Sequence, residues 1–199
     1  MLFEMLRYMD VPVIEIKLHP RAKDFLFEHY VSLSKIFSNV LGLFETDYLS
    51  IALINQADQL FILSSNPSIE QNLIEKELWQ YDGSYQSDFI FQDQPSLWSE
   101  LYHPQYTNQL KQYKQENLSL VTGISIPTNI DLYRAVFLFG FKSIQPLIQQ
   151  KTSSQCKKLL AIGKYCLNEI RAKIPFPDQQ KHVTNKPKLT LIINNEDNL

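Results

Sequence analysis

Glycine, cysteine and long apolar runs are scarce in this chain of 199 residues, and each shortage excludes a class of protein. The five glycines form no glycine-rich loop of the kind that cradles phosphate groups. No apolar run approaches the roughly 20 residues that a membrane-spanning helix needs. The opening MLFEMLRYMD carries acidic residues where a signal peptide has a basic start and an apolar centre. We therefore expect a cytoplasmic protein that does not insert into a membrane.

The cysteine and histidine residues are few and widely spaced. Cys156 and Cys166 stand ten residues apart in a stretch with helical periodicity, which places them about 15 Å apart and out of disulfide reach. We interpret them as two buried core thiols. The four histidines show no metal-ligand spacing, and no GxSxG motif or paired carboxylates are present. The sequence thus favours a protein that is not an enzyme and holds no metal or cofactor.

Charge of either sign is also not in excess. The 19 basic and 21 acidic residues give a formal net charge of −2, so no overall field attracts nucleic acid or an anionic membrane. What the sequence does contain is 44% hydrophobic residues, enough for one domain with a substantial core.

Apolar periodicity along the chain predicts an edge strand, helices and two hairpins. Residues 13–20 alternate like a short exposed strand, which Pro20 ends. Residues 21–44 repeat apolar side chains at four-three spacing, which predicts one helix with a core-facing stripe or, alternatively, a dimer seam. The members of this stripe are Leu26, Tyr30, Leu33, Phe37, Val40 and Phe44.

The first hairpin is predicted over residues 46–65, with the polar bend NQADQ between its strands. Leu49, Ile51 and Leu53 share a bulky face of its first strand, whereas Tyr48, Ser50, Ala52 and Ile54 share a thin one. The second hairpin is predicted over residues 120–140. Thr122, Gly123 and Ser125 interrupt its first strand, and its second strand is apolar on both faces, so both sides of the sheet need covering.

Helices are predicted between and after these hairpins. One begins at Asn66 and Pro67, a polar one surrounds Leu110, and a long amphipathic one begins near Thr152. The apolar side of this long helix holds Cys156, Leu159, Gly163, Cys166, Leu167 and Ile170. This order predicts an α+β fold, a three-layer α-β-α sandwich around an antiparallel sheet of about five strands, as in PAS and GAF sensors. We divide the chain into an N-terminal arm (1–20), this domain (21–174) and a polar linker or tail (175–199).

The small residues of the second hairpin point to a possible ligand site. A semi-apolar ligand needs a concave cavity with a few convergent polar groups, and small strand residues can open one. Gly123 and Ser125 can therefore form the floor of a pocket. The alternative is that they allow a helix to pack closely on the sheet.

The stretch LSLVTGISIP, placed between a polar helix and the second apolar strand, resembles the autoinducer-binding domain of LuxR-type transcriptional regulators. Gly123, Ile124, Ser125, Ile126 and Pro127 match the family's strand motif. The segment WQYDGSYQSDFIFQDQPSLW is similar to the family's Tyr, Asp and Trp segment, and the likeness covers about residues 25–171. It implies a PAS/GAF-like sensor that takes part in quorum sensing.

The resemblance also implies roles for single residues. Asp88 would accept a hydrogen bond from the amide of an acyl-homoserine lactone, Trp98 would pack on the lactone head, and Tyr81 and Tyr85 would line the pocket. The alternatives are a loop or helix-cap carboxylate for Asp88 and a core anchor for Trp98.

The expected function is that of a small-molecule sensor. The ligand would stabilise a homodimer and reposition an output element beyond Arg171. DNA would be bound only through a helix-turn-helix domain, for which residues 175–199 are too few. The alternative is a ligand-free protein-interaction module of the same fold.

Overall fold

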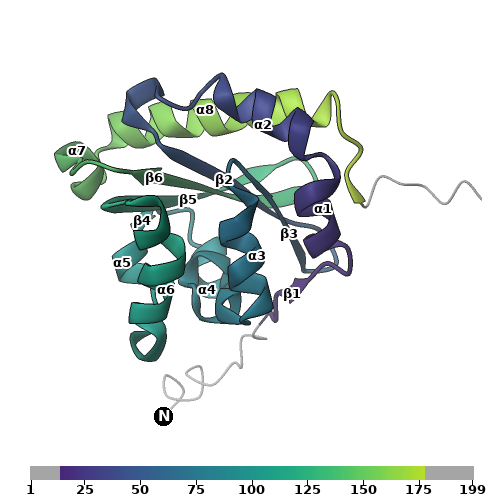
Figure 1. Cartoon of the computed structure of the whole chain (residues 1–199), viewed down its shortest axis with the longest axis horizontal. Helices are drawn as coiled ribbons and strands as arrows, with labels where there is room; N and C mark the ends of the chain where they lie inside the picture. The colour runs from purple at the N-terminus through teal and green to yellow at the C-terminus, as the bar shows by residue number, and fades with distance from the viewer. Residues whose placement is uncertain (1–13, 178–199) are drawn as a thin grey trace, which may run out of the picture.

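The computed structural model describes residues 14–177, which form three layers with a β-sheet in the middle. In Figure 1, α2 and α8 cross one face of the sheet, and α3, α4, α5 and α6 cover the other. The α-β-α sandwich expected from the sequence is therefore confirmed.

The sheet has six strands in the order β1-β3-β2-β6-β5-β4. Their bounds are β1 Lys17–Leu18, β2 Tyr48–Ile54, β3 Gln59–Ser64, β4 Ser96–Leu97, β5 Thr122–Ile130 and β6 Tyr133–Phe141. Both predicted hairpins are confirmed, and β2 of the first pairs antiparallel with β6 of the second. The sheet was predicted as antiparallel with about five strands; the structure has six, and β1 at the edge runs parallel to β3.

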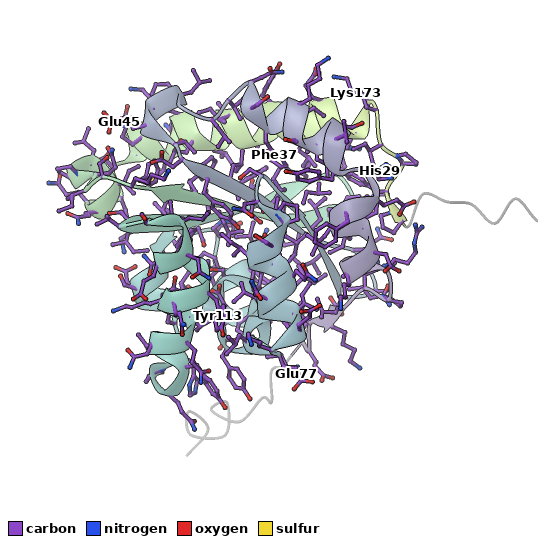
Figure 2. All side chains as sticks on the ribbon, in the orientation of Figure 1. His29, Phe37, Glu45, Glu77, Tyr113 and Lys173 are labelled. Atoms are coloured by element: carbon purple, nitrogen blue, oxygen red, sulfur yellow. The ribbon has the colours of Figure 1, made fainter. Side chains whose placement is uncertain are left out.

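The layer that contains α8 covers the bulky face of the sheet. Its helices are α1 Ala22–Glu28, α2 Tyr30–Ser38, α7 Pro146–Gln149 and α8 Ser153–Arg171, with the 3₁₀ turn η2 Leu43–Glu45 after α2. Leu49, Ile51 and Leu53 of β2 join Phe137 and Phe139 of β6 in the core beneath them. Figure 2 shows Phe37 of α2 beside the sheet in this core, where it is fully buried.

The prediction of one continuous helix over residues 21–44 was wrong. The chain breaks at His29, whose φ of −118° and ψ of 22° are not helical, so α1 and α2 lie at different places against the sheet. Leu33, Phe37 and Val40 keep the predicted core-facing role, whereas Tyr30 is 46% exposed. The apolar side predicted for α8 is confirmed, since all six of its residues are buried.

The opposite layer is built from short elements. They are α3 Pro67–Glu75, η3 Leu78–Tyr81, η4 Gly83–Tyr85, α4 Ser87–Ile90, α5 Trp98–Leu101, η5 Pro104–Tyr106, α6 Thr107–Lys114 and η6 Glu116–Leu118. The layer rests on the thin face of the sheet, where Tyr48, Ala52 and Leu138 form a second core with Trp98 and Leu110. This second core holds the candidate site.

Candidate ligand site on the thin face of the sheet

Small side chains lie in two adjacent rows across the thin face of the sheet. In one row Ser50 is paired with both Ser64 and Leu138, and Leu138 is paired with Ser125. In the next row Gly140 is paired with both Gly123 and Tyr48. Cross-strand partners on one face are direct neighbours, so these serines and glycines lie close together on the thin face, beside Leu138 and Tyr48. Large side chains of the helical layer fill the space above it.

Trp98 occupies the space above the glycines. It is fully buried, and a Cβ atom added at Gly123 would overlap its indole ring. A Cβ added at Gly140 would lie 3.1 Å from the same indole. The ring of Tyr48 meets the indole edge-on, with 5.9 Å between the ring centroids. The glycines are therefore required by close packing, which was the alternative to a pocket floor.

A buried ion pair lies beside the indole. Lys114, the last residue of α6, has a fully buried side chain and pairs with Asp82, which is equally buried. Asp82 also accepts a hydrogen bond from the backbone N–H of Ser84 at 3.0 Å, and Lys114 Nζ lies 3.2 Å from Ser84 Oγ. The hydroxyls of Ser84 and Ser125 are 3.0 Å apart, which ties the ion pair to the sheet.

Three aromatic rings surround the ammonium group of Lys114. Nζ lies 4.4 Å from the ring centroid of Trp98, 5.5 Å from that of Tyr102 and 5.7 Å from that of Tyr85. Rings at such distances attract a cation through their electron-rich faces. Desolvation by burial lowers the pKa of Lys114, while the charge of Asp82 opposes that shift. The carboxylate and the rings together replace water around the ammonium.

A second buried carboxyl group, that of Glu70 in α3, lies in the same layer. The hydroxyl of Tyr48 donates a hydrogen bond to Glu70 Oε1. Burial raises the pKa of Glu70, and interactions with Tyr48, Ser64 and Ser50 reduce this rise. Burial also raises the pKa of Tyr48 well above 10.0, and the nearby Glu70 adds to the shift. Burial thus disfavours the charged form of Glu70, and the Tyr48 hydroxyl stays a hydrogen-bond donor.

Several buried polar atoms of this layer have no hydrogen-bond partner among residues 14–177. They are Ser50 Oγ, Glu70 Oε2, Tyr85 Oη and Trp98 Nε1. Burial raises the pKa of Tyr85 well above 10.0, and the charges of Asp82 and Glu70 add to this shift. Unpaired buried groups cost about 1–3 kcal/mol each. Such a concentration of unpaired polar atoms in one buried layer marks a place where a polar group supplied by a ligand would be stabilised.

The structure brings together four of the six residues predicted for the site. Tyr85, Trp98, Gly123 and Ser125 all contribute to this buried layer. Tyr81 is only partly buried, and its ring stacks on Tyr106 with centroids 3.7 Å apart. Asp88 is exposed in the first turn of α4, away from the buried carboxylates.

Three central residues of the layer were not among the predicted ones. Lys114 follows buried Leu110 by four residues and so shares its helix face, a signal that the sequence does contain. Glu70 precedes buried Leu73 by three residues in the same way. Asp82 has the sequence signature of a turn, since it caps η4 through Ser84, and nothing local indicates its burial.

The clefts on the surface lie elsewhere. One, of about 500 Å³, runs between β1 and the segment from η3 to α4, with Ile16, Leu18, Trp79 and Gln86 in its walls. Trp79 belongs to the second core and Ile16 and Leu18 pack against it, so this cleft adjoins the buried layer from outside. A smaller cleft of about 240 Å³ lies at the start of α8 beside Cys156. Neither of these clefts has Trp98 in its wall.

Residues 14–177 show neither a metal centre nor a membrane helix. No group of three His, Cys, Asp or Glu side chains within these residues could hold a metal ion. No helix among them is both long and apolar enough to span a bilayer. Cys156 and Cys166 are free and buried, as predicted.

The three layers and the sheet order define the class as a GAF/PAS-like α-β-α sandwich. No protein-family model matches the sequence, and no curated protein matches it either. Solved structures do match. The crystal structure of SdiA from Escherichia coli aligns with a TM-score of 0.52 and 9% identity, over 83% of this chain and 71% of that one.

A further structure agrees with this assignment of the fold. The solution structure of the first 171 residues of E. coli SdiA gives a TM-score of 0.50 and 10% identity, over 76% of this chain and 94% of that one. The VqsR LBD domain from Pseudomonas aeruginosa also matches, with a TM-score of 0.48 and 15% identity over 75% of this chain and 96% of that one, but the assignment of the fold rests on the SdiA structures. The chain therefore has the fold of LuxR-type autoinducer-binding domains, and the resemblance inferred from the strand around Gly123 is confirmed for the fold.

Proposed function

We propose that this domain senses a small semi-apolar molecule, which binds between the thin face of the sheet and the layer formed by α3 to α6. The observation that carries the proposal is the group of unpaired buried atoms, Glu70 Oε2, Tyr85 Oη and Trp98 Nε1. A ligand that supplied their missing partners would recover part of the cost of burying them. The chain has the fold of LuxR-type autoinducer-binding domains, which supports the same function.

The apolar part of such a ligand has a suitable neighbourhood. Aromatic and aliphatic side chains, among them Tyr48, Leu73, Ile90 and Leu138, surround the polar groups in the second core. The cleft of about 500 Å³ beside Gln86 adjoins this core and offers further apolar wall at Ile16 and Trp79. A few polar groups within an apolar lining are typical of small-molecule sites. An acyl-homoserine lactone is one candidate that the resemblance implies.

The test is native mass spectrometry of the protein purified from its own host, compared with the denatured mass of the same sample. We expect a stoichiometric extra mass of a few hundred daltons, of the order of a drug-sized ligand, that is lost on denaturation. Tyr85→Phe removes the unpaired hydroxyl and keeps the ring, so it should weaken retention of the ligand. Tyr113→Phe is the matched control, because Tyr113 lies on the same layer but outside the buried cluster.

A second candidate function is a protein-interaction module with a filled interior. One observation favours it: the indole of Trp98 and the Lys114 side chain occupy the space above Gly123 and Ser125. A protein that carries no extra mass, and takes none up from extract of its host culture, would contradict the sensor proposal and favour this module.

In this proposal the signal is transmitted through the layer that contains α2 and α8. A homodimer would use α2 and α8, where Tyr30, Val31 and Tyr165 expose 46%, 82% and 49% of their surfaces. Ligand binding would stabilise this dimer by mass action and reposition an output element beyond Arg171. Val31→Lys should then convert the dimer to monomers in light scattering, whereas a mass unchanged by this substitution would contradict this part of the proposal.

A further inference from the structure

β1 forms one edge of the sheet, because among residues 14–177 it pairs with β3 alone. The backbone N–H groups of Lys17 and His19 donate hydrogen bonds to the carbonyl oxygens of Asp58 and Leu60, at 3.0 and 2.8 Å. Successive residues of a strand direct their backbone groups to opposite edges, so those of the two alternate residues, Ile16 and Leu18, face away from β3. An edge with such groups can accept a further strand.

The cleft of about 500 Å³ lies along this edge. Its strand wall holds Ile14, Ile16 and Leu18, and its opposite wall holds Trp79, Gln86 and Ser87. The side chains of Glu15 and Lys17, which alternate with the apolar ones, form an exposed ion pair at 3.3 Å. The cleft therefore combines free backbone groups, an apolar row and the Trp79 indole. These are the features by which a sheet edge binds an extended peptide.

The chain itself contains a segment of the matching kind. Residues 189–193 read LTLII, and they are the one apolar run after Pro177, with polar residues before and after it. Three of the five residues, Thr190, Ile192 and Ile193, are β-branched, which favours a strand. The alternate residues Leu189, Leu191 and Ile193 would share one face of such a strand. That face would continue the apolar row of β1 toward Trp79.

The described part of the chain ends close to this edge. The ring of Phe176 packs on Phe61 of β3 with 5.5 Å between centroids, and the ring of His19 lies 6.2 Å from the same Phe61. Figure 1 shows the chain leaving α8 and running beside α1, on the side of the domain that carries β1. A strand added to β1 would lie about 10 Å from β3, two strand spacings away. Residues 178–188 can span up to about 35 Å, so residues 189–193 can reach this position.

We propose that residues 189–193 bind in this cleft as a further strand beside β1 of the same chain. The backbone groups of Ile16 and Leu18 hold the added strand, and its apolar face packs toward Trp79. The strand covers the second core on the side of the cleft, and it prevents this edge from pairing with a second molecule. This inference does not depend on the ligand proposal.

Hydrogen exchange of single backbone amides, measured by NMR on the full chain, tests the proposal. We expect the amides of Ile16 and Leu18 to exchange at least about tenfold more slowly in the wild type than in Leu191→Pro, because proline interrupts a strand ladder. Asn195→Pro lies outside the apolar run, so it is the matched control and should keep the slow exchange. The amides of Lys17 and His19 are bonded to the sheet and should be unchanged in all three proteins.

Neither substitution lies among residues 14–177, so the domain should fold in both variants. Fast exchange of Ile16 and Leu18 in the wild type would overturn the proposal. Slow exchange that persists in Leu191→Pro would also overturn it, since another segment or a partner would then cover the edge. We expect the exchange rates to be independent of protein concentration. Protection that is lost on dilution would mean that a second copy supplies the strand, which would overturn the assignment to the same chain.

Discussion

The indole of Trp98 lies where the Cβ atom of any other residue at position 123 would be. Gly123 belongs to β5 and Trp98 begins α5, so this contact fixes the distance between the sheet and the helical layer. The strand keeps its glycine because a larger side chain would displace the largest fully buried residue of the domain.

Gly123→Ala should therefore destabilise the fold, although alanine suits a regular strand better than glycine does. Overpacking of a filled core typically costs about 1–3 kcal/mol, and urea unfolding measures the change. In a Trp98→Leu background the same substitution should cost less, because the smaller side chain leaves room for the methyl group. Equal costs in both backgrounds would contradict the contact.

The buried pair of Lys114 and Asp82 gives the second prediction. Lys114→Met leaves the Asp82 carboxylate buried without a counter-charge, and the loss of one partner of such a pair costs about 3–5 kcal/mol. Adding Asp82→Asn should recover part of this free energy of unfolding. Lys111→Met on the exposed side of α6 is the control and should change stability by less than about 0.5 kcal/mol. A fully additive double variant would show that the two groups do not interact.

Alternation of side chains made the sheet predictable. In β2 and β6 every second residue is large and apolar, so the assignment of faces followed from the period of two, and all of it is confirmed. The long helix α8 was equally clear, because its apolar positions repeat from Cys156 to Ile170. The break at His29 was not predictable in this way, since the apolar spacing continues across it.

The site was harder to predict, because its central charged residues belong to elements whose sequence indicates exposure to solvent. Glu70 has the sequence features of a helix-start carboxylate and Asp82 those of a turn residue, and only the fold brings both of them close to Lys114. Gly123 and Ser125 were chosen because small residues interrupt an apolar strand, whereas Trp98 was chosen by resemblance. Asp88, chosen by resemblance, lies six residues after the buried Asp82.

The two thiols provide the third prediction, which concerns their reactivity. Burial raises the pKa of Cys166 to about 12 and also raises that of Cys156. Since the thiolate is the reactive form, both should react slowly with Ellman's reagent at pH 8, Cys156 the faster because it is 8% exposed. In concentrated guanidinium both should react at once. Rapid reaction of the native protein would contradict their burial, and a Cys166→Ala variant assigns the slower phase.

The fourth prediction concerns the pH dependence of stability and follows from Glu70. Its pKa is raised from 4.5 in the folded protein, so the folded state holds this proton more tightly than the unfolded state does. The stabilisation is fully present below pH 4.5 and is lost as the pH rises through the folded pKa. Glu70→Gln cannot ionise, so its free energy of unfolding should rise relative to that of the wild type across this window.

The groups that face Glu70 do not cancel this trend. The pKa of Tyr48 lies well above 10.0, so its hydroxyl remains a donor throughout, and Ser50 and Ser64 do not titrate. Lys114 keeps Asp82 as its direct partner. Glu75→Gln should show the opposite sign, because Lys23 lowers the pKa of Glu75 and its contribution is lost as the pH falls. Urea unfolding at a series of pH values measures the free energy of unfolding of the wild type, Glu70→Gln and Glu75→Gln. Parallel curves for the wild type and Glu70→Gln would mean that Glu70 is not buried in its neutral form.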